Sequence, residues 1–390
     1  MQCNVCKSLL GEPIFASRSD TALTSLCEQR PGQVQVWSCM HCGHLLGQPL
    51  AETEAYYASD YRILLDHDDE DQIYELHDGA IVYRTDHQVK VLRQKIDFPE
   101  GALLLDYGCA KAAMPKRLLA SRPDLQVHLF DVSEMYLRHW DRFLQPERRA
   151  VNETPAAWAG RFDVVTSFFA LEHIPLPLDT VRKVAALLKD GGLFYAIVPD
   201  TFGNVADFVV IDHVNHFTEP SVRALLRQAG FDNVSVDSQA HRGALVIVAR
   251  KAAAGETTEP EPATAAVLHS VRAESLRLAS YWSTVDGRIQ NAERQHAGRD
   301  LAIYGSGFYG AYIFTALQDS SRVRCFLDQS PFQHGKALFD RPILKPESLP
   351  DDVQVLFIGL NPTIARQTIE QLSWLAERNV ATVFLDGSTS

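Results

Sequence analysis

The sequence predicts an α/β protein with a cysteine-rich N-terminal module, a central Rossmann-like domain and a C-terminal Rossmann-like domain. Between residues 101 and 250, apolar runs that end in a carboxylate or a glycine alternate with helix-length amphipathic segments, which predicts a parallel sheet with crossover helices. The same alternation resumes at residue 299. The third observation is that cysteines cluster before residue 43. A chain of 390 residues has room for two or three such parts.

Composition places the chain among ordinary globular proteins, with 46% hydrophobic and 22% charged residues. A formal net charge of -12 opposes binding of nucleic acid through the bulk field, so we expect no nucleic-acid partner. No run of 18 or more apolar residues is present, so we expect no membrane partner. The first six residues lack the basic start and apolar stretch of a signal peptide, which favours a cytoplasmic location. The oligomeric state stays open.

Residues 1–50 are expected to be a zinc-binding domain of the zinc-ribbon type. Two Cys-x-x-Cys pairs lie about thirty residues apart, and each pair can sit on a tight knuckle so that four thiolates converge on one Zn²⁺. A site with four cysteine ligands has no open position, so the predicted zinc is structural. The alternatives are a redox Cys-x-x-Cys pair or buried free thiols. The predicted ligands are Cys3, Cys6, Cys39 and Cys42.

Residues 51–100 are interpreted as a helical connecting segment rich in tyrosine, from which Tyr57 and Tyr61 could reach a neighbouring site. Residues 101–250 form the central domain. Its first predicted strand ends at Asp106 and Gly108, and its second ends at Asp131. Ligands of such sheets bind at the carboxyl ends of the strands, and a carboxylate there can accept hydrogen bonds from two ribose hydroxyls.

The turn after the first strand separates two classes of cofactor. A dinucleotide fold uses Gly-x-Gly-x-x-Gly to seat a pyrophosphate on a helix N-terminus. Here only Gly108 is present, and Ala110 and Ala112 follow it, which argues against a pyrophosphate. S-adenosylmethionine (SAM), which has no pyrophosphate, stays compatible with the pattern.

Segments 106–109, 167–175 and 191–192, together with Asp131, resemble class I SAM-dependent methyltransferases. The order of parts is similar to that of sugar C-methyltransferases of deoxysugar pathways, which combine a four-cysteine zinc domain, a SAM domain and a C-terminal Rossmann-like domain. The most telling stretch is 212–218, which matches the family's catalytic segment. The resemblance implies a cofactor site made by Asp106, Gly108, Ala110, Asp131 and Phe168, the last of which is alternatively a core residue.

The resemblance also implies a histidine base, because transfer to a carbon beside a ketone needs removal of an α-proton. His213 is the first choice and His173 the second, with Asp212 and His216 as neighbours that tune or orient the base. Each histidine is alternatively a structural residue of a loop or helix end. The family has Glu where this chain has Asp212 and Tyr where it has Val210, which favours O-methylation somewhat.

Residues 251–298 are expected to form a linker and a long helix, and residues 299–390 the C-terminal Rossmann-like domain. Here Gly-x-Gly-x-x-Gly follows a predicted strand and precedes a helix, and an aspartate ends the next strand. The pattern predicts a nucleotide pocket, a turn kept for packing alone, or an NAD site. The candidate pocket residues are Gly305, Gly307, Gly310 and Asp328.

The sequence therefore predicts an enzyme that uses SAM and structural zinc to methylate a small molecule. C-methylation of a nucleotide-linked keto-deoxysugar in saccharide or natural-product biosynthesis is the leading hypothesis. O-methylation of a sugar or natural product is the alternative. The third hypothesis is a non-catalytic or RNA-directed zinc-ribbon protein.

Overall fold

The computed structural model describes residues 1–50, 56–57, 61, 70–77, 80–253 and 262–389. The chain divides into two compact units, and each unit is made of three segments that are separate in the sequence. The first unit comprises Met1–Pro13, Val36–Thr201 and Asp212–Glu274. The second comprises Ile14–Gln35, Phe202–Ile211 and Ser275–Ser390.

A seven-stranded sheet in the order β10-β9-β8-β11-β12-β15-β14 forms the centre of the first unit. Neighbours from β10 to β12 are parallel, and β15 is antiparallel to both β12 and β14. The strands are β8 (Leu103–Tyr107), β9 (Gln126–Asp131), β10 (Arg149–Val151), β11 (Phe162–Phe168), β12 (Leu188–Pro199), β14 (Phe231–Asp237) and β15 (Ala244–Lys251).

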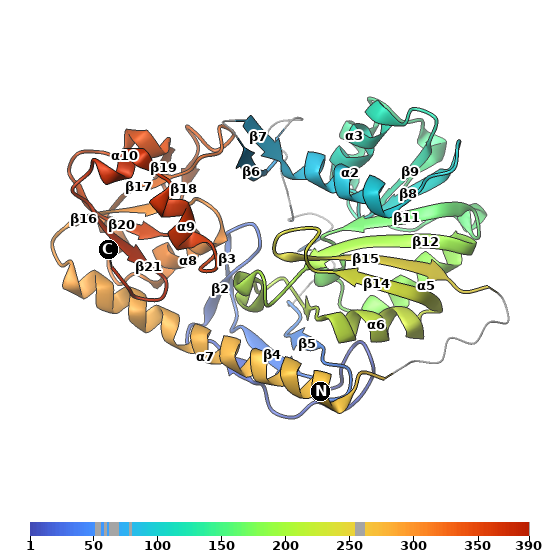
Figure 1. The fold of residues 1–390 in the computed structure, drawn as a ribbon, viewed down its shortest axis with the longest axis horizontal. Coiled ribbons are helices and arrows are strands. Elements are labelled where there is room, and N and C mark those ends of the chain that lie inside the picture. The colour runs from blue at the N-terminus through green and yellow to red at the C-terminus, as the bar shows by residue number, and fades with distance from the viewer. Residues whose placement is uncertain (51–55, 58–60, 62–69, 78–79, 254–261, 390) are drawn as a thin grey trace. The chain divides into compact units, whose positions relative to one another are not determined.

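Helices cover both faces of this sheet (Figure 1). One face carries α2 (Arg84–Lys95), α3 (Ala113–Ser121) and α4 (Leu137–Trp140), and the other carries α5 (Pro177–Leu187) and α6 (Glu219–Gln228). Successive strand side chains point to opposite faces, so the apolar runs of the sequence fill both layers. Leu104 packs in the α2–α3 layer and Leu105 in the α5–α6 layer, and both are fully buried.

The direction of the chain across the sheet reverses at β8. From β8 the chain moves to β9 and β10 on one side, and then returns to β11 and β12 on the other. The loops that leave β8 and β11 therefore diverge and leave a crevice at the carboxyl ends of these strands. This is the usual ligand position of an open α/β sheet.

The cysteine knuckles belong to the first unit and share its core. Cys3, Val5, Cys39 and Cys42 pack in the same apolar cluster as sheet residues such as Leu105. Strand β5 (Leu45–Gly47) pairs antiparallel with both β4 (Gln35–Ser38) and β13 (Asn215–His216). The knuckles are thus joined by backbone hydrogen bonds to the segment around residue 215.

Two sequence expectations differ from the structure. Within 51–100, which was expected to be helical, β6 (Ile73–His77) and β7 (Ala80–Tyr83) form an antiparallel hairpin, and α2 follows this hairpin directly. Several β-branched and aromatic residues favour strands here, and the Asp-Gly pair between the two strands in the sequence is a hairpin signal. Other parts of 51–69 lie outside the described residues.

The second difference concerns residues 1–50, which do not stay together. The stretch between the two cysteine pairs belongs to the second unit. It contains β1 (Phe15–Ala16) and the antiparallel pair β2 (Thr21–Leu23) and β3 (Gln29–Pro31). The unusually long spacing of the cysteine pairs therefore reflects an excursion of the chain and not a longer ribbon.

The second unit contains a six-stranded sheet in the order β18-β19-β17-β16-β20-β21, in which only the β18–β19 pair is antiparallel. Long helix α7 (Ala265–Gln295) lies within the span 251–298 that was expected to form a linker and a long helix, and it belongs to the second unit from Ser275 onward. Trp282 of this helix donates from Nε1 to the carbonyl oxygen of Val205 at 2.8 Å. The remaining elements are β16 (Asp300–Tyr304), α8 (Phe308–Ala316), β17 (Val323–Leu327), β18 (Ala337–Leu338), β19 (Arg341–Leu344), β20 (Val353–Ile358), α9 (Ala365–Glu370), α10 (Ser373–Ala376) and β21 (Ala381–Phe384).

Within the described ranges, no helix combines the length and apolarity that crossing a membrane requires.

Candidate active site

A cavity of about 800 Å³ lies in the first unit at the carboxyl ends of β8, β9 and β11. Its volume is in the usual range for small-molecule sites. The wall is made by the ends of these strands, by α2 and by two tyrosines that precede the hairpin. The lining residues used below are Tyr57, Tyr61, Arg84, Asp106, Gly108, Ala110, Asp131, Phe168, Phe169 and His173.

Asp131 ends β9 with a buried carboxylate at the cavity wall. Its Oδ2 accepts from the backbone N–H of Ala110 at 2.8 Å, and its Oδ1 accepts from that of Ser133 at 3.1 Å. Burial raises the pKa of this carboxyl above its ordinary value, while the backbone donors oppose the shift. Each carboxylate oxygen has a second lone pair, so Asp131 can still accept hydrogen bonds from a ligand.

Asp106 sits near the end of β8, and its Oδ1 accepts from the hydroxyl of Thr166 on β11 at 2.7 Å. Burial raises the pKa of Asp106 to about 7, against the lowering effect of the Thr166 hydroxyl. A cationic ligand beside this carboxyl would favour its ionised form. The predicted carboxylates at the first two strand ends thus face one cavity.

The turn after β8 keeps a glycine-like backbone although two of its glycine positions hold alanine. Ala110 has φ of 45° and Ala112 has φ of 59°, both in the left-handed region. Gly108 has φ of 78°, and a Cβ there would lie 2.9 Å from the Cβ of Ala170. The backbone is therefore strained at both alanines, and this strained conformation keeps the turn open toward the cavity.

A residue that the sequence analysis missed holds this turn in place. Trp140, fully buried at the end of α4, donates from Nε1 to the carbonyl oxygen of Ala110 at 2.7 Å. No local sequence signal marks this contact, because it joins positions thirty residues apart.

Aromatic rings form another part of the wall. Phe168 at the end of β11 is half-buried, and its ring centroid lies 5.6 Å from that of Tyr195. The guanidinium of Arg84 lies 3.7 Å from the ring centroid of Phe169, which has φ of 52°. Burial lowers the pKa of Arg84, and the nearby Glu172 opposes this shift. Arg84 was not predicted from the sequence.

His173 lies at the cavity wall in a buried cluster with polar and aromatic neighbours. Its Nδ1 is 2.8 Å from the hydroxyl of Tyr57 and 3.1 Å from the carbonyl oxygen of Asp212. The Oδ2 of Asp212 is 3.7 Å from the same nitrogen. The rings of Tyr57 and Tyr61 pack on the imidazole at centroid distances of 5.2 and 5.3 Å.

His213 packs edge-on against His173, with ring centroids 4.7 Å apart. The described residues that line the cavity include His173 and do not include His213. Side-chain ligand atoms of Glu172, His173 and His213 all lie within 4.8 Å of one another. The structure therefore brings the predicted histidines together and puts His173 nearer to the ligand space.

Tyr57 is placed as a neutral hydrogen-bond donor. Burial raises the pKa of its phenol far above the ordinary value, and the carboxylate of Asp212 adds to the shift. Its hydroxyl lies 2.9 Å from the carbonyl oxygen of Asp212 as well as close to His173. The phenol thus keeps its proton at physiological pH.

The structure places His216 apart from this cluster. It lies in β13, opposite Leu45 of β5, and is almost fully buried. A Cβ built on Gly47 would approach the Nε2 of His216 to 3.2 Å. His216 therefore faces the strands of the cysteine module.

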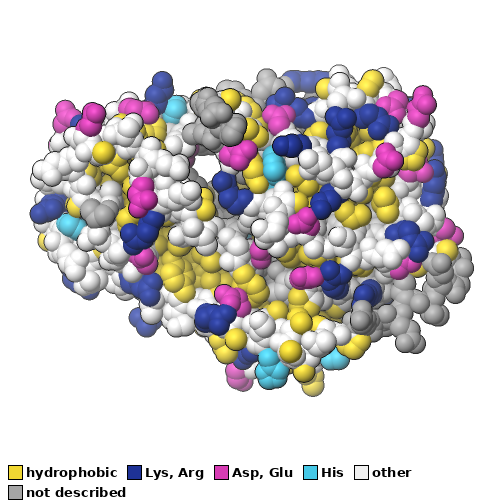
Figure 2. Space-filling view, viewed as in Figure 1, with side chains coloured by type: hydrophobic (Ala, Val, Ile, Leu, Met, Phe, Trp, Pro, Cys, Tyr) yellow, Lys and Arg dark blue, Asp and Glu magenta, His cyan; other side chains and the backbone are white. Residues whose placement is uncertain are grey.

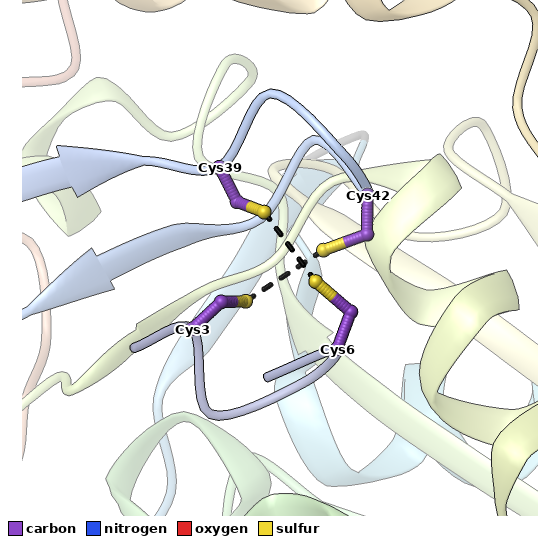
Figure 3. Close-up of side chains that lie close together, drawn as sticks. All are labelled: Cys3, Cys6, Cys39 and Cys42. Carbon is purple, nitrogen blue, oxygen red and sulfur yellow. Dashed lines mark hydrogen bonds between the residues drawn. The ribbon is translucent and has the colours of Figure 1, made fainter. Parts of the chain in front are cut away.

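The four predicted metal ligands converge (Figure 3). The Sγ atoms of Cys3 and Cys42 lie 3.7 Å apart, and those of Cys6 and Cys39 lie 3.5 Å apart. All four sulfur atoms lie within 4.8 Å of one another, and all four thiols are free. A tetrahedral zinc with Zn–S bonds of about 2.3 Å requires sulfur atoms about 3.8 Å apart, so the donor set fits zinc.

The glycine turn of the second unit is tightly packed. A Cβ on Gly310 would lie 1.9 Å from the carbonyl oxygen of Gly305, and a Cβ on Gly305 would lie 2.4 Å from that of Gly359. Asp328 directs both carboxylate oxygens inward, accepting from the N–H and hydroxyl of Ser306 and from the N–H of Ser330. Of the three glycines in this turn, Gly307 alone has no atom within 4 Å of its Cβ position. The geometry favours the packing alternative over a nucleotide pocket.

Residues 82–236 match the protein family described as a methyltransferase domain. The ubiquinone biosynthesis O-methyltransferase of Vibrio parahaemolyticus serotype O3:K6 (strain RIMD 2210633) is 30% identical over 116 residues, or 27% of this chain and 49% of that protein. The enzyme of the same name from Xanthomonas axonopodis pv. citri (strain 306) is 30% identical over 151 residues, or 34% of this chain and 63% of that protein. The chain thus spans between about half and two thirds of these relatives.

Among solved structures, an S-adenosylmethionine-dependent methyltransferase from Mesorhizobium loti is 16% identical and aligns with a TM-score of 0.35. The alignment covers 42% of this chain and 97% of that one. The family match covers α2 and the strand ends that line the cavity, and Tyr57 and Tyr61 lie outside it. Residues 82–236 are therefore similar to a methyltransferase domain, and the curated relatives that align with the chain are named as methyltransferases.

Proposed function

We propose that this protein transfers the methyl group of SAM to a small molecule, and that the acceptor is a nucleotide-linked keto-deoxysugar methylated at carbon. The observation that carries the proposal is one cavity with the two strand-end carboxylates on its wall together with the Tyr57–His173 pair. Such a cavity has donors and acceptors for a cofactor on one part of its wall and a base on another.

The residues present fit SAM. Asp131 would accept hydrogen bonds from the ribose hydroxyls, and Asp106 would lie beside the cationic part of the cofactor. Phe168 offers an aromatic face to the adenine. When bound, SAM supplies a methyl group on a sulfonium, which any correctly placed nucleophile can accept.

His173 is the proposed general base, because it lines the cavity and His213 packs behind it. The Tyr57 hydroxyl and the Asp212 carbonyl fix the ring through Nδ1, which leaves Nε2 as the atom able to take a proton. His213 and Asp212 hold the orientation of His173. This geometry favours His173 over His213, which was the first choice from the sequence.

C-methylation also needs a donor for the enolate oxygen that forms when the α-proton leaves. The neutral phenol of Tyr57 lies beside the base, and it would take this role by turning its O–H from the carbonyl oxygen of Asp212 to the acceptor. It supplies the phenol group that the sequence lacks at Val210. Positioning of acceptor and base would then contribute most of the rate enhancement.

O-methylation is the second candidate, and the names of the curated relatives favour it. The same base would remove a hydroxyl proton from the acceptor. An RNA-directed role is disfavoured by charge. On the face shown in Figure 2, acidic and basic side chains intermix, and the net charge is -12.

We also propose that the four-cysteine cluster holds one structural zinc ion. The sulfur separations fit a tetrahedral site, and four thiolates leave no coordination position for an acceptor. The zinc would stabilise the packing of the knuckles in the core of the first unit.

Calorimetry with SAM tests the cofactor site. Asp131→Ala should weaken SAM binding roughly tenfold or more, because charge-assisted hydrogen bonds to the ribose are lost. Asp163→Ala is the matched control, since Asp163 lies at the amino end of β11 and accepts from the N–H of Leu103 at 2.8 Å. Equal affinity of the wild type and Asp131→Ala would show that the ribose binds elsewhere.

A further inference from the structure

One buried side chain, Asn215, connects the cysteine module to the turn that carries His173. Asn215 is fully buried. Its amide nitrogen donates to the carbonyl oxygen of Leu171 at 2.8 Å and to that of Ile174 at 2.7 Å. These two carbonyls bracket His173, which ends the short 3₁₀ turn η5 (Leu171–His173). Asn215 therefore holds the backbone on both sides of the proposed base.

The amide oxygen of Asn215 faces the cysteine module. It accepts from the Nδ2 of Asn4 at 2.6 Å and lies 3.2 Å from the Nε2 of His44. Asn4 stands inside the first Cys-x-x-Cys pair, and His44 follows the second pair by two residues. An amide oxygen can only accept, so the Nε2 of His44 carries the N–H that donates to it.

Both cysteine knuckles make additional contacts with the chain that follows His173 and with the 213–218 segment. Asn4 donates a further hydrogen bond to the carbonyl oxygen of Pro175 at 3.2 Å. The hydroxyl of Thr218 donates to the carbonyl oxygen of Gly43 at 3.0 Å, and the N–H of Gly47 donates to that of Val214 at 2.9 Å. The cysteine module thus touches the His173 turn and the 213–218 segment at several points.

The network uses the full hydrogen-bonding capacity of one amide. Two N–H donors and one oxygen acceptor are all engaged in a site without exposed atoms of Asn215. A buried amide with these four contacts has one low-energy orientation, because any rotation leaves buried polar groups unpaired. A change in the separation of the knuckles would therefore be transmitted to the turn that bears His173.

We propose that Asn215 is a positioning residue through which the metal-bound cysteine cluster sets the alignment of His173 with His213. The proposal rests on the proposed zinc site and methyltransferase function, and it adds that the metal has a role in the active site as well as in folding. Nothing in it requires the metal to touch the acceptor.

The decisive variant is Asn215→Asp, which keeps the size and the acceptor oxygen but replaces the donating amide nitrogen by an oxygen that faces two carbonyls. We expect zinc content and SAM affinity to stay within about twofold of wild type. Backbone hydrogen exchange at His173 and Ile174, whose N–H groups bond to Ala170 and Leu171, should accelerate roughly tenfold or more. The ¹⁵N signals of the His173 ring, assigned with His173→Gln, should shift.

Asn233→Asp is the matched control, because it makes the same change of charge at an exposed position of β14. It should leave exchange and the His173 signals unchanged. Asn4→Ala is the second variant, and it decides the question if Asn215→Asp does not fold. It removes donors to Asn215 and Pro175 without removing a cysteine, and it should change the same amides and the same ring signals.

Removal of zinc from the wild type with a chelator should reproduce the effect of Asn4→Ala at His173 and Ile174. A folded, zinc-containing Asn215→Asp or Asn4→Ala protein with wild-type exchange and ring signals would overturn the proposal. Unchanged exchange at these two amides after zinc removal would also overturn it. Failure of the proposed function is read separately, as absence of SAM binding or of zinc in the wild type.

Discussion

Ala110 holds a backbone conformation that usually belongs to glycine. Its φ of 45° brings its N–H to the carboxylate of Asp131 and its carbonyl to Trp140. A left-handed conformation costs a non-glycine residue roughly 1–2 kcal/mol. The hydrogen bonds to Asp131 and Trp140 thus hold the turn after β8 in this strained conformation, and the strain lies next to the proposed cofactor site.

Ala110→Gly should therefore stabilise the protein. Relief of strain exceeds the entropy that glycine adds to the unfolded chain, for a net gain of about 0.5 kcal/mol. Denaturant unfolding measures the gain. Ala113→Gly is the control at the start of α3, where glycine should cost about 1 kcal/mol. Destabilisation by Ala110→Gly as large as that by Ala113→Gly would contradict the strain argument.

At the scale of elements, the cysteine knuckles act as part of the core of the first unit. Cys39→Ser should remove the metal and lower the midpoint of thermal unfolding of the whole unit, because Cys39 packs in one cluster with the sheet. Metal analysis and calorimetry measure both effects. Cys27→Ser should change neither, since Cys27 lies outside the cluster. A zinc-containing Cys39→Ser protein of wild-type stability would refute the assignment.

The glycine turn before α8 is predicted to serve packing. Gly310→Ala should destabilise the second unit by about 3 kcal/mol or more, because its Cβ would overlap the carbonyl oxygen of Gly305. Gly307→Ala is tolerated, since nothing lies within 4 Å of its Cβ and its φ is -87°. Thermal unfolding separates the two. Comparable stability of both variants would reopen the interpretation as a ligand-binding turn.

The sequence could predict features that depend on local pattern. Strand ends at Asp106 and Asp131 were found because apolar runs stop there, and the four cysteines were found by their spacing. The pairing of β6 with β7 differs from the helical prediction, although the Asp-Gly pair in the sequence between these strands is a local hairpin signal. Trp140 and Asn215 carry no local signal, since their partners lie far away in the chain.

At the scale of the whole molecule, the chain alternates between two compact units. Between the two cysteine pairs, the chain passes from the first unit into the second over Ile14–Gln35. It does so again between β12 and Asp212, over Phe202–Ile211. The proposed catalytic segment thus starts where the chain returns to the first unit. Neither unit can be removed by a single cut, so experiments on function require the full chain.

Transfer of a deuterated methyl group from SAM to a panel of nucleotide-linked keto-deoxysugars, read by mass spectrometry, tests the central claim most directly. The wild type should add one labelled methyl group to a member of the panel. His173→Ala should lower that rate by about 10²–10⁴ with SAM affinity unchanged, as expected for loss of a general base. A wild type that binds SAM but labels no sugar, or a His173→Ala variant with the wild-type rate, would contradict the account.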